Sequence, residues 1–347
     1  MKLKPWIKSV IIVLIGLAVA AFVIVPLPFY IEAPGATINL KELITVDGKA
    51  DESSGSFSLT SVGIRQATGL LAVKAKFTDF EDIISKEELT GGATSEEYNQ
   101  MQKYYMESSQ NAAIEQALKL ANQSYTMKFE GVYVMSVEKN SNFYGKLAVG
   151  DTVTKVDGKT FKSSEEFMKY IKSQEVGQSV TVTFLHAGEE KEATGDLIKL
   201  STDKKPGIGI TLTDHTEISS DTNVKINAGS IGGPSAGLMF TLEIYDQVTG
   251  SNLRQGKAIA GTGTINSSGE VGRIGGIDKK VASANQAGMD IFFAPDDTLD
   301  PAIKKKYPEL KSNYEEAKAA AEKLDSKMKI VPVKTVQDAL NYLKKMS

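Results

Sequence analysis

The sequence predicts an α+β protein that is attached to a membrane by one N-terminal transmembrane helix. Three observations carry this prediction. Residues 9–31 contain no charged side chain. Residues 125–200 hold short strand-like runs separated by turn signals. From residue 201 to residue 347, strand-like and helix-like runs alternate, which indicates a second domain that mixes the two element types.

The composition narrows the class of protein. A chain of 347 residues is long enough for two or three domains, and 41% hydrophobic with 24% charged residues is typical of a globular protein. The net charge of −3, with no long basic run, argues against nucleic-acid binding. The absence of cysteine excludes a disulfide scaffold, a thiol nucleophile and a lipoprotein anchor. With only two histidines we expect no metal site, and we expect no cofactor.

Residues 9–31 are predicted to form the transmembrane anchor and to contact membrane lipid. As a helix, these 23 residues would measure about 35 Å, enough to cross a bilayer, although Pro26 and Pro28 are expected to end or kink it. Lys2, Lys4 and Lys8 precede the run, which predicts a cytoplasmic tail over residues 1–8 and an extracellular remainder. A cleaved signal peptide is the alternative. Its candidate cleavage site, residues 18–20, lies inside the apolar run rather than after it.

Residues 32–124 are predicted to be an extracytoplasmic α/β region. Phe57 and Leu59 indicate a strand, since polar residues alternate with them. A helix is predicted over residues 95–122, with Glu96 and Glu97 in its first turn. The apolar stripe of this helix is typical of a face that packs on a core.

Residues 125–200 are predicted to be a compact β-rich module. Strands are predicted at 132–137, 152–156 and 180–185, and a helix begins at Ser164. This order resembles a bacterial PDZ domain, in which Gly150-Asp151 and Asp157-Gly158 match familiar positions. The resemblance implies a peptide-binding groove between residues 129–134 and the helix from Ser164. The alternative is a spacer of similar fold that binds nothing.

Small residues surround Ser235 in the stretch 227–237, and a helix-forming run follows directly. A serine at such a junction lies near free backbone N–H groups and the positive end of a helix dipole, which suit an oxyanion. Residues 233–237 also fit the pattern G-x-S-x-G of α/β-hydrolases. That fold needs a histidine after the serine, whereas His186 and His215 both precede Ser235. The base of a nucleophilic Ser235 must therefore be another residue type.

Lys279 and Lys280 are the candidate bases. A lysine acts as a general base when burial lowers its pKa towards neutrality, and serine–lysine pairs are a known variant of the catalytic triad. The residues after Lys280 are mostly small and end at Gly288, which predicts a helix that can pack tightly. The spacing alone does not choose between the two lysines.

Three blocks in the last 150 residues resemble the proteolytic domain of Lon. They are Gly233-Pro234-Ser235-Ala236-Gly237, Ile259-Ala260-Gly261-Thr262-Gly263-Thr264-Ile265, and Gly269 to Lys280. The resemblance implies Ser235 as nucleophile and Lys280 as base. It gives supporting roles to Thr262 beside the lysine and to Gly233 and Pro234 before the serine. Lon usually carries an acidic residue where this chain has Gly232, so that carboxylate has no counterpart here.

The layout as a whole resembles the membrane-anchored PDZ–Lon proteases of Gram-positive bacteria, with the proteolytic domain at residues 201–347. It implies a serine endopeptidase that works without ATP or any other nucleotide and cleaves peptides or small proteins outside the cell. Secreted peptides, such as a peptide pheromone, and small membrane proteins are the expected substrates. The alternative is a membrane-tethered PDZ adaptor with a degenerate protease domain. The oligomeric state is left open by the sequence.

Overall fold

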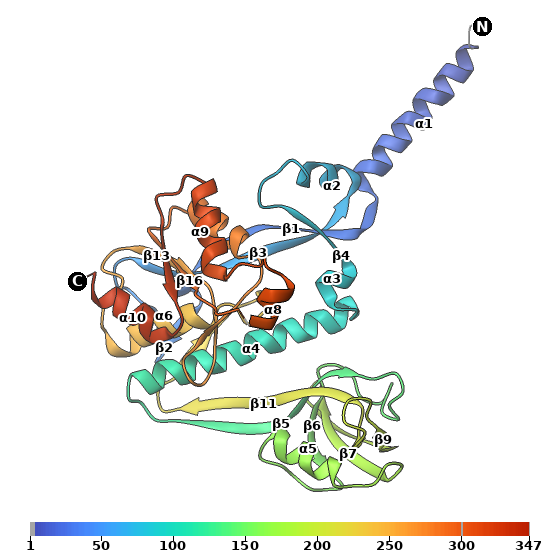
Figure 1. Cartoon of the computed structure of the whole chain (residues 1–347), viewed down its shortest axis with the longest axis vertical. Coiled ribbons are helices and arrows are strands. Elements are labelled where there is room, and N and C mark those ends of the chain that lie inside the picture. Colours follow the sequence, from blue (N-terminus) through green and yellow to red (C-terminus); the bar gives the residue numbers. More distant parts are fainter. Residues whose placement is uncertain (1–3, 300, 347) are drawn as a thin grey trace.

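The computed structural model describes residues 4–299 and 301–346. It shows an apolar helix, a six-stranded sheet with helices packed on it, and a five-stranded β-rich module (Figure 1). The predicted mixture of helices and strands is confirmed. Residues 1–3, which include Lys2 of the predicted cytoplasmic tail, lie outside the described residues.

The apolar helix α1 (Pro5–Ile24) extends away from the rest of the chain (Figure 1). Residues Trp6–Ile24 are apolar and long enough to cross a membrane, and none of this stretch is buried. Its 19 residues measure about 28 Å, close to the hydrocarbon thickness of a bilayer. The helix stops at Ile24, so the span predicted to run to Ile31 is shorter. Pro26 begins a strand instead, and Ile31, a residue of this strand, is fully buried.

The six-stranded sheet has the order β17-β16-β13-β3-β1-β4. The three strands β13, β16 and β17 run parallel to β3, whereas β1 is antiparallel to both β3 and β4. Their bounds are β1 (Pro26–Asn39), β3 (Ser56–Thr68), β4 (Asp82–Ser85), β13 (Ala258–Gly261), β16 (Ile291–Pro295) and β17 (Lys329–Val333). The strand β17 lies at an edge, as its Pro332 predicts, because proline cannot donate a ladder hydrogen bond.

Residues 32–124 were predicted to be a region of their own, but the strand pairing joins them to the C-terminal domain. Phe57 lies opposite Ile259, and Leu59 lies opposite Gly261, in the parallel pair of β3 and β13. Both Phe57 and Leu59 are buried in the same core as the C-terminal helices. The periodicity of a strand predicts which of its faces is buried but not which strand it pairs with, so the sequence did not reveal this union.

Helices cover both faces of this sheet. On one face lie α6 (Gly237–Thr249) and α10 (Val336–Lys344), with α4 packed on α6. On the other face lie α7 (Ile277–Gln286) and α9 (Asn313–Lys323). Successive side chains of β16 point to opposite faces of the sheet, as expected for a sheet covered on both sides. Phe293 lies in the core on the first face, and Phe292 lies in the core on the second.

The long helix α4 (Ser95–Leu120) runs between the sheet and the β-rich module (Figure 1). It agrees with the helix predicted over residues 95–122. Thr94 and Glu97 form a capping box at its start, which satisfies two backbone N–H groups there. Its buried side chains, such as Met106, Ile114 and Leu118, belong to the core that also contains α6.

The β-rich module has the strand order β11-β5-β6-β7-β8. Its elements are β5 (Tyr125–Val137), β6 (Thr152–Val156), α5 (Ser164–Lys172), β7 (Ser179–His186), β8 (Glu189–Asp196) and β11 (Ile210–Ser220). The strand β11 pairs with β5 from end to end, so the module continues to Ser220. This edge strand lies beyond the boundary predicted at residue 200.

The remaining elements are short. The block of residues 259–265 holds two short strands, β13 and β14, and Gly263, with φ of +151°, lies between them. The short elements are η1 (Leu40–Glu42), β2 (Ile44–Val46), α2 (Gly69–Ala75), α3 (Lys86–Thr90), β9 (Ile198–Lys199), β10 (Pro206–Gly207), β12 (Val224–Ile226), β14 (Thr264–Ile265), β15 (Val271–Gly272) and α8 (Pro301–Lys306).

A buried charge cluster ties α6 to the segment before β3. Arg254 is fully buried, and its guanidinium contacts Glu243 at 3.1 Å, Asp246 at 3.1 Å and Asp51. Burial raises the pKa of Glu243 to about 7, although the nearby Arg254 opposes the rise. Among the described residues, Glu243 and Asp246 have Arg254 as their only cationic partner, whereas Asp51 also lies 3.7 Å from the Nζ of Lys41. A buried charge without a partner is costly.

We therefore expect Arg254→Ala to lower the free energy of unfolding by about 3–5 kcal/mol, because it leaves the buried carboxylates of Glu243 and Asp246 without a cation. Arg65→Ala is the matched control. Arg65 also pairs with a carboxylate, that of Glu81, but its side chain is 45% exposed. Arg65→Ala should lower the free energy of unfolding by less than about 1 kcal/mol. Urea denaturation of both variants in detergent measures the difference, and equal effects would contradict the role assigned to the cluster.

Candidate active site

The turn that carries Ser235 lies between β12 and α6, where α4 packs against it. The N–H of Gly233 donates to the carbonyl of Gln102 at 3.0 Å, and the hydroxyl of Ser109 donates to the carbonyl of Pro234 at 3.0 Å. Gly233 has φ of +88°, a conformation that favours glycine. The small residues of this stretch thus allow a sharp turn against a helix surface.

Lys280 reaches this turn from α7. Its side chain is buried, and Nζ lies 2.6 Å from the Oγ of Ser235 and 3.0 Å from the Oγ1 of Thr262. The Thr262 hydroxyl in turn donates to the carbonyl of Ser235 at 3.0 Å. The structure therefore brings together Ser235, Lys280 and Thr262, which are separated by up to 45 positions in the chain.

Burial lowers the pKa of Lys280 from its ordinary value to about 8, and the nearby carboxylate of Glu32 partly opposes this shift. A low-polarity environment disfavours the charged form of an amine. With this pKa, about a tenth of Lys280 is neutral at pH 7, and the neutral amine is the form that accepts a proton.

Lys279 lies in a different electrostatic environment, although it is the next residue of the same helix. Its Nζ is 2.5 Å from Asp82, 3.3 Å from Asp278 and 3.5 Å from Glu32. Burial alone would lower the pKa of Lys279, but the hydrogen bond with Asp82 and the charges of Asp278 and Glu32 raise it above its ordinary value. Lys279 thus stays charged and is unsuited to be a base.

A cleft of about 890 Å³ opens in front of Ser235. One wall is β3 from Leu59 to Val62, a second is the turn from Ser230 to Ala236, and Tyr98 and Gln102 of α4 close a third side. The strand β13 pairs with β3 only over residues 56–59. Beyond this point, β3 has no strand on that edge within the described residues.

Two backbone N–H groups in the turn are open to a ligand. Within the described chain, the N–H groups of Ser235 and Ala236 have no hydrogen-bond acceptor. Gly233 differs, because its N–H already donates to Gln102, and Pro234 has no N–H. Of the predicted supporting residues, Gly233 and Pro234 shape the turn and contact α4, whereas Thr262 contacts Lys280 directly.

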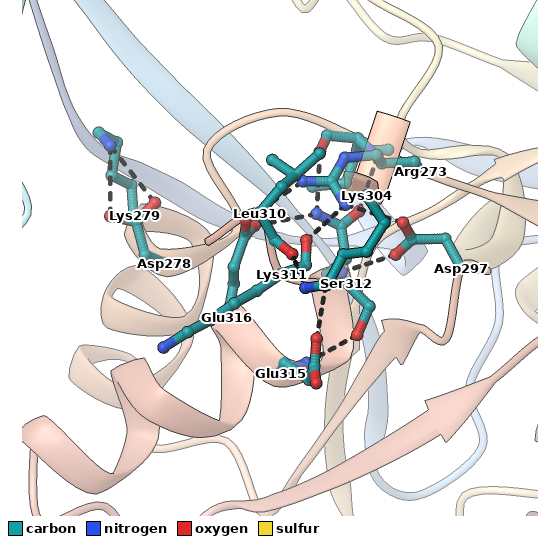
Figure 2. Close-up of polar contacts among 12 residues, drawn as sticks. Arg273, Asp278, Lys279, Asp297, Lys304, Leu310, Lys311, Ser312, Glu315 and Glu316 are labelled. Carbon is teal, nitrogen blue, oxygen red and sulfur yellow. Dashed lines mark hydrogen bonds and ion pairs between the residues drawn. The ribbon is translucent and has the colours of Figure 1, made fainter. Parts of the chain in front are cut away.

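Arg273 lines the rim of the cleft, but its charge is already balanced. Figure 2 shows its guanidinium among Asp297, Glu316 and the carbonyl of Lys311, at 2.8, 3.1 and 2.8 Å. The same view shows Asp278 and Lys279 apart from this cluster. Arg273 therefore joins the segment before α7 to the start of α9.

Sequence reasoning missed the residues that α4 and β1 contribute to the site. Glu32 of β1 and Tyr98, Gln102 and Ser109 of α4 precede Ser235 by more than 120 positions. The only signal was Ser109, a small polar residue on the apolar side of a helix. Neither histidine belongs to the site, since His186 contacts Asp151 and His215 contacts Thr152, both within the β-rich module.

A second cleft, of about 610 Å³, lies on the β-rich module between α5 and β11. Phe167, Met168 and Ile171 line it from the helix, and residues 210–214 line it from the strand. The groove was predicted beside residues 129–134 instead. That stretch belongs to β5, which lies between β11 and β6, so it has no free edge to offer a peptide. The free edge next to the helix belongs to β11.

Two family models match the chain and together cover most of it. Residues 105–197 match the PDZ domain, and residues 198–345 match the Lon protease (S16) C-terminal proteolytic domain. The chain therefore combines a PDZ domain with a Lon C-terminal proteolytic domain, an arrangement consistent with a PDZ–Lon protease. These matches confirm both resemblances and identify the larger domain as that of a serine peptidase.

Individual relatives match parts of the chain. Lon protease of Fusobacterium nucleatum is 42% identical over 65 residues, which are 19% of the chain and 8% of that protein. Lon protease of Desulforamulus reducens is 37% identical over 79 residues, 22% of the chain and 10% of that protein. The chain thus spans about a tenth of the length of these curated relatives.

Solved structures match the smaller domain. The PDZ domain of the SdrC-like protein from Listeria monocytogenes is 41% identical, with a TM-score of 0.24. The match covers 24% of the chain and 90% of that domain. The second domain of a Listeria innocua protein is 42% identical, with a TM-score of 0.24. The match covers 25% of the chain and 87% of that domain.

The contact between Thr262 and Lys280 leads to a prediction about pH dependence. Thr262→Val keeps the shape of the side chain but removes an acceptor that favours the charged lysine, so the pKa of Lys280 should fall further. We expect the pH–rate curve to shift to lower pH and the maximal rate to fall roughly tenfold, from one lost hydrogen bond.

Thr241→Val is the matched control, because Thr241 is also buried but bonds only within its own helix. Its pH–rate curve should coincide with that of the unaltered enzyme. A Thr262→Val enzyme whose curve has not moved would show that the threonine does not act on the lysine.

Proposed function

We propose that this PDZ–Lon protease is a membrane-anchored serine endopeptidase that uses Ser235 as nucleophile and Lys280 as general base. The observation that carries the proposal is the 2.6 Å contact between Lys280 Nζ and Ser235 Oγ, at a lysine whose pKa burial lowers to about 8. Nucleophile and base within hydrogen-bond reach are the geometry that such chemistry requires.

The proposed reaction begins when neutral Lys280 takes the proton of the Ser235 hydroxyl. The serine oxygen then bonds to a peptide carbonyl carbon, and the negative charge on the carbonyl oxygen faces the free N–H groups of Ser235 and Ala236. Lys280 returns its proton to the leaving amine as the peptide bond breaks. Water, deprotonated by Lys280, then releases the acyl group from the serine and restores the enzyme.

The cleft supports an extended peptide as substrate. Beyond Leu59, the edge of β3 that faces the cleft carries no paired strand, so its backbone groups are available to a peptide that adds alongside. A folded protein does not present its backbone in this way. The sequence contains no G-x-x-x-x-G-K-[ST] loop for a nucleotide. We therefore propose short or unfolded substrates, cleaved without ATP: secreted peptides or small membrane proteins.

The anchor and its orientation belong to the same proposal. An uncleaved α1 crosses the bilayer once, with Lys4 and Lys8 on the cytoplasmic side and both domains outside the cell. The lysine asymmetry supports this orientation. The lipid contact through α1 and the extracellular location of the catalytic domain follow from it.

The groove between α5 and β11 is proposed to bind a second stretch of the substrate. An apolar helix face beside a free strand edge is the arrangement that accepts a peptide by strand addition. Binding there raises the local concentration of substrate near Ser235. A purely adaptor function is less well supported, because a degenerate site would not retain both a serine and a neutralised lysine in contact.

We expect Ser235→Ala and Lys280→Ala each to abolish cleavage of an unstructured peptide, and the double variant to be no worse than either. Lys280→Arg should also be inactive, since guanidinium stays protonated. The rate of the unaltered enzyme should rise with pH through a midpoint near 8, because the neutral lysine is the active form.

Lys279→Ala is the matched control, one position away on the same helix, and it should retain much of the activity. Circular dichroism checks that all variants are folded. A folded Lys280→Arg enzyme with near-normal turnover would exclude lysine as the base.

The peptide groove is tested by Met168→Asp, which places a charge among apolar lining residues. We expect KM for a long substrate to rise about tenfold, while cleavage of a short peptide that occupies only the catalytic cleft is unchanged. Tyr144→Asp is the matched control, because Tyr144 is an exposed aromatic residue of the same module outside this groove. Equal losses with both substrates would instead indicate a structural role for the groove.

A further inference from the structure

The short helix α2 carries an apolar surface that no other part of the described chain covers. Leu70 is 48% exposed, Val73 49% and Phe77, just after the helix, 87%. Spacings of three and four residues place these side chains on one side of the helix. We call these three residues the α2 patch. The opposite side of α2 is covered by the rest of the domain, because Leu71 and Ala75 pack with Ile31 of β1.

The α2 patch lies at the point where α1 enters the folded domain. Pro26, two residues after α1, pairs with Thr68, the residue that caps α2. The ring of Phe22, near the end of α1, lies against Gly69 and leaves no room for a side chain there. Figure 1 shows α2 beside the C-terminal end of α1.

We infer that the α2 patch inserts into the lipid interface of the bilayer that α1 crosses. This inference rests on the proposed anchor, since an α1 in the membrane brings α2 to its surface. Leucine, valine and phenylalanine on one side of a surface helix are typical of helices that lie in the interface. Lys76 flanks the patch, and a long lysine side chain reaches the headgroups while its stem stays in apolar surroundings. Lys74, which also flanks it, is paired with Glu81 at 2.8 Å.

Insertion at two points fixes the height of the catalytic cleft above the bilayer. A single helix leaves the folded domain free to tilt, whereas α1 and the α2 patch together restrain it. Glu32, which lines the cleft, is six residues beyond Pro26 on β1. At about 3.3 Å per residue, this places the cleft at most roughly 20 Å from the membrane surface. Substrates whose scissile bond lies within several extended residues of the membrane fit this geometry.

The absence of cysteine allows a direct test on the full chain. Single cysteines are introduced as Val73→Cys and Phe77→Cys, labelled with an environment-sensitive fluorophore and reconstituted in phosphatidylcholine–phosphatidylglycerol vesicles. Some vesicles also contain a lipid with a nitroxide quencher near its headgroup. Tyr144→Cys is the control for an exposed aromatic position far from α1, and Ile12→Cys reports on the anchor itself.

We expect quenching at residues 73 and 77 to be at least about threefold stronger than at residue 144, because an interfacial helix face lies within reach of such lipids. Quenching at residue 12 with none at 73 and 77 would overturn the inference and leave the anchor intact. No quenching at residue 12 would overturn the anchor as well. Disulfide crosslinking between two Phe77→Cys chains, without lipid quenching, would assign the patch to a second copy and also overturn the inference.

Discussion

The side chain of Lys280 is buried and held against Ser235, and this contact depends on several elements of the larger domain. An amine in such surroundings loses hydration that only its charged form needs, so burial lowers its pKa to about 8. The burial depends on α7 packing against the sheet, and the alanines after Lys280 permit close packing there. The same burial would be costly for two lysines, and the chain avoids this cost because Lys279 turns towards three carboxylates.

The catalytic turn also depends on α4. One side of this helix bonds the turn through Gln102 and Ser109. Another side contacts β11, because Tyr104 donates to the carbonyl of Asp214 and Asn111 donates to that of Thr216 at 2.7 Å. The helix thus joins the strand that borders the peptide groove to the turn that carries the serine. The PDZ domain is fixed to the proteolytic domain through this helix as well as through the chain connections.

The PDZ domain is inserted within the sequence of the larger domain. Strands β1 and β3 come before the insertion and β13, β16 and β17 after it, yet all five lie in one sheet. The insertion is tolerated because its two ends, at the start of β5 and the end of β11, are adjacent: Tyr125 lies opposite Ser220. A β-rich unit that enters and leaves at one point does not disturb the sheet into which it is inserted.

The sequence by itself determined the features that depend on local composition: the uncharged N-terminal run, the order of elements in the PDZ domain, the capped helix from Ser95 and the small residues around Ser235. These follow from hydrophobic periodicity and turn chemistry, which act over a few residues. Only the tertiary structure decided which strands share a sheet and that β11, rather than β5, borders the peptide groove. It also showed that Lys280, and not Lys279, contacts Ser235. Consecutive helix residues point about 100° apart. Two of the carboxylates that pair with Lys279, those of Glu32 and Asp82, belong to strands about 250 and about 200 residues earlier in the chain. No local pattern contains that information.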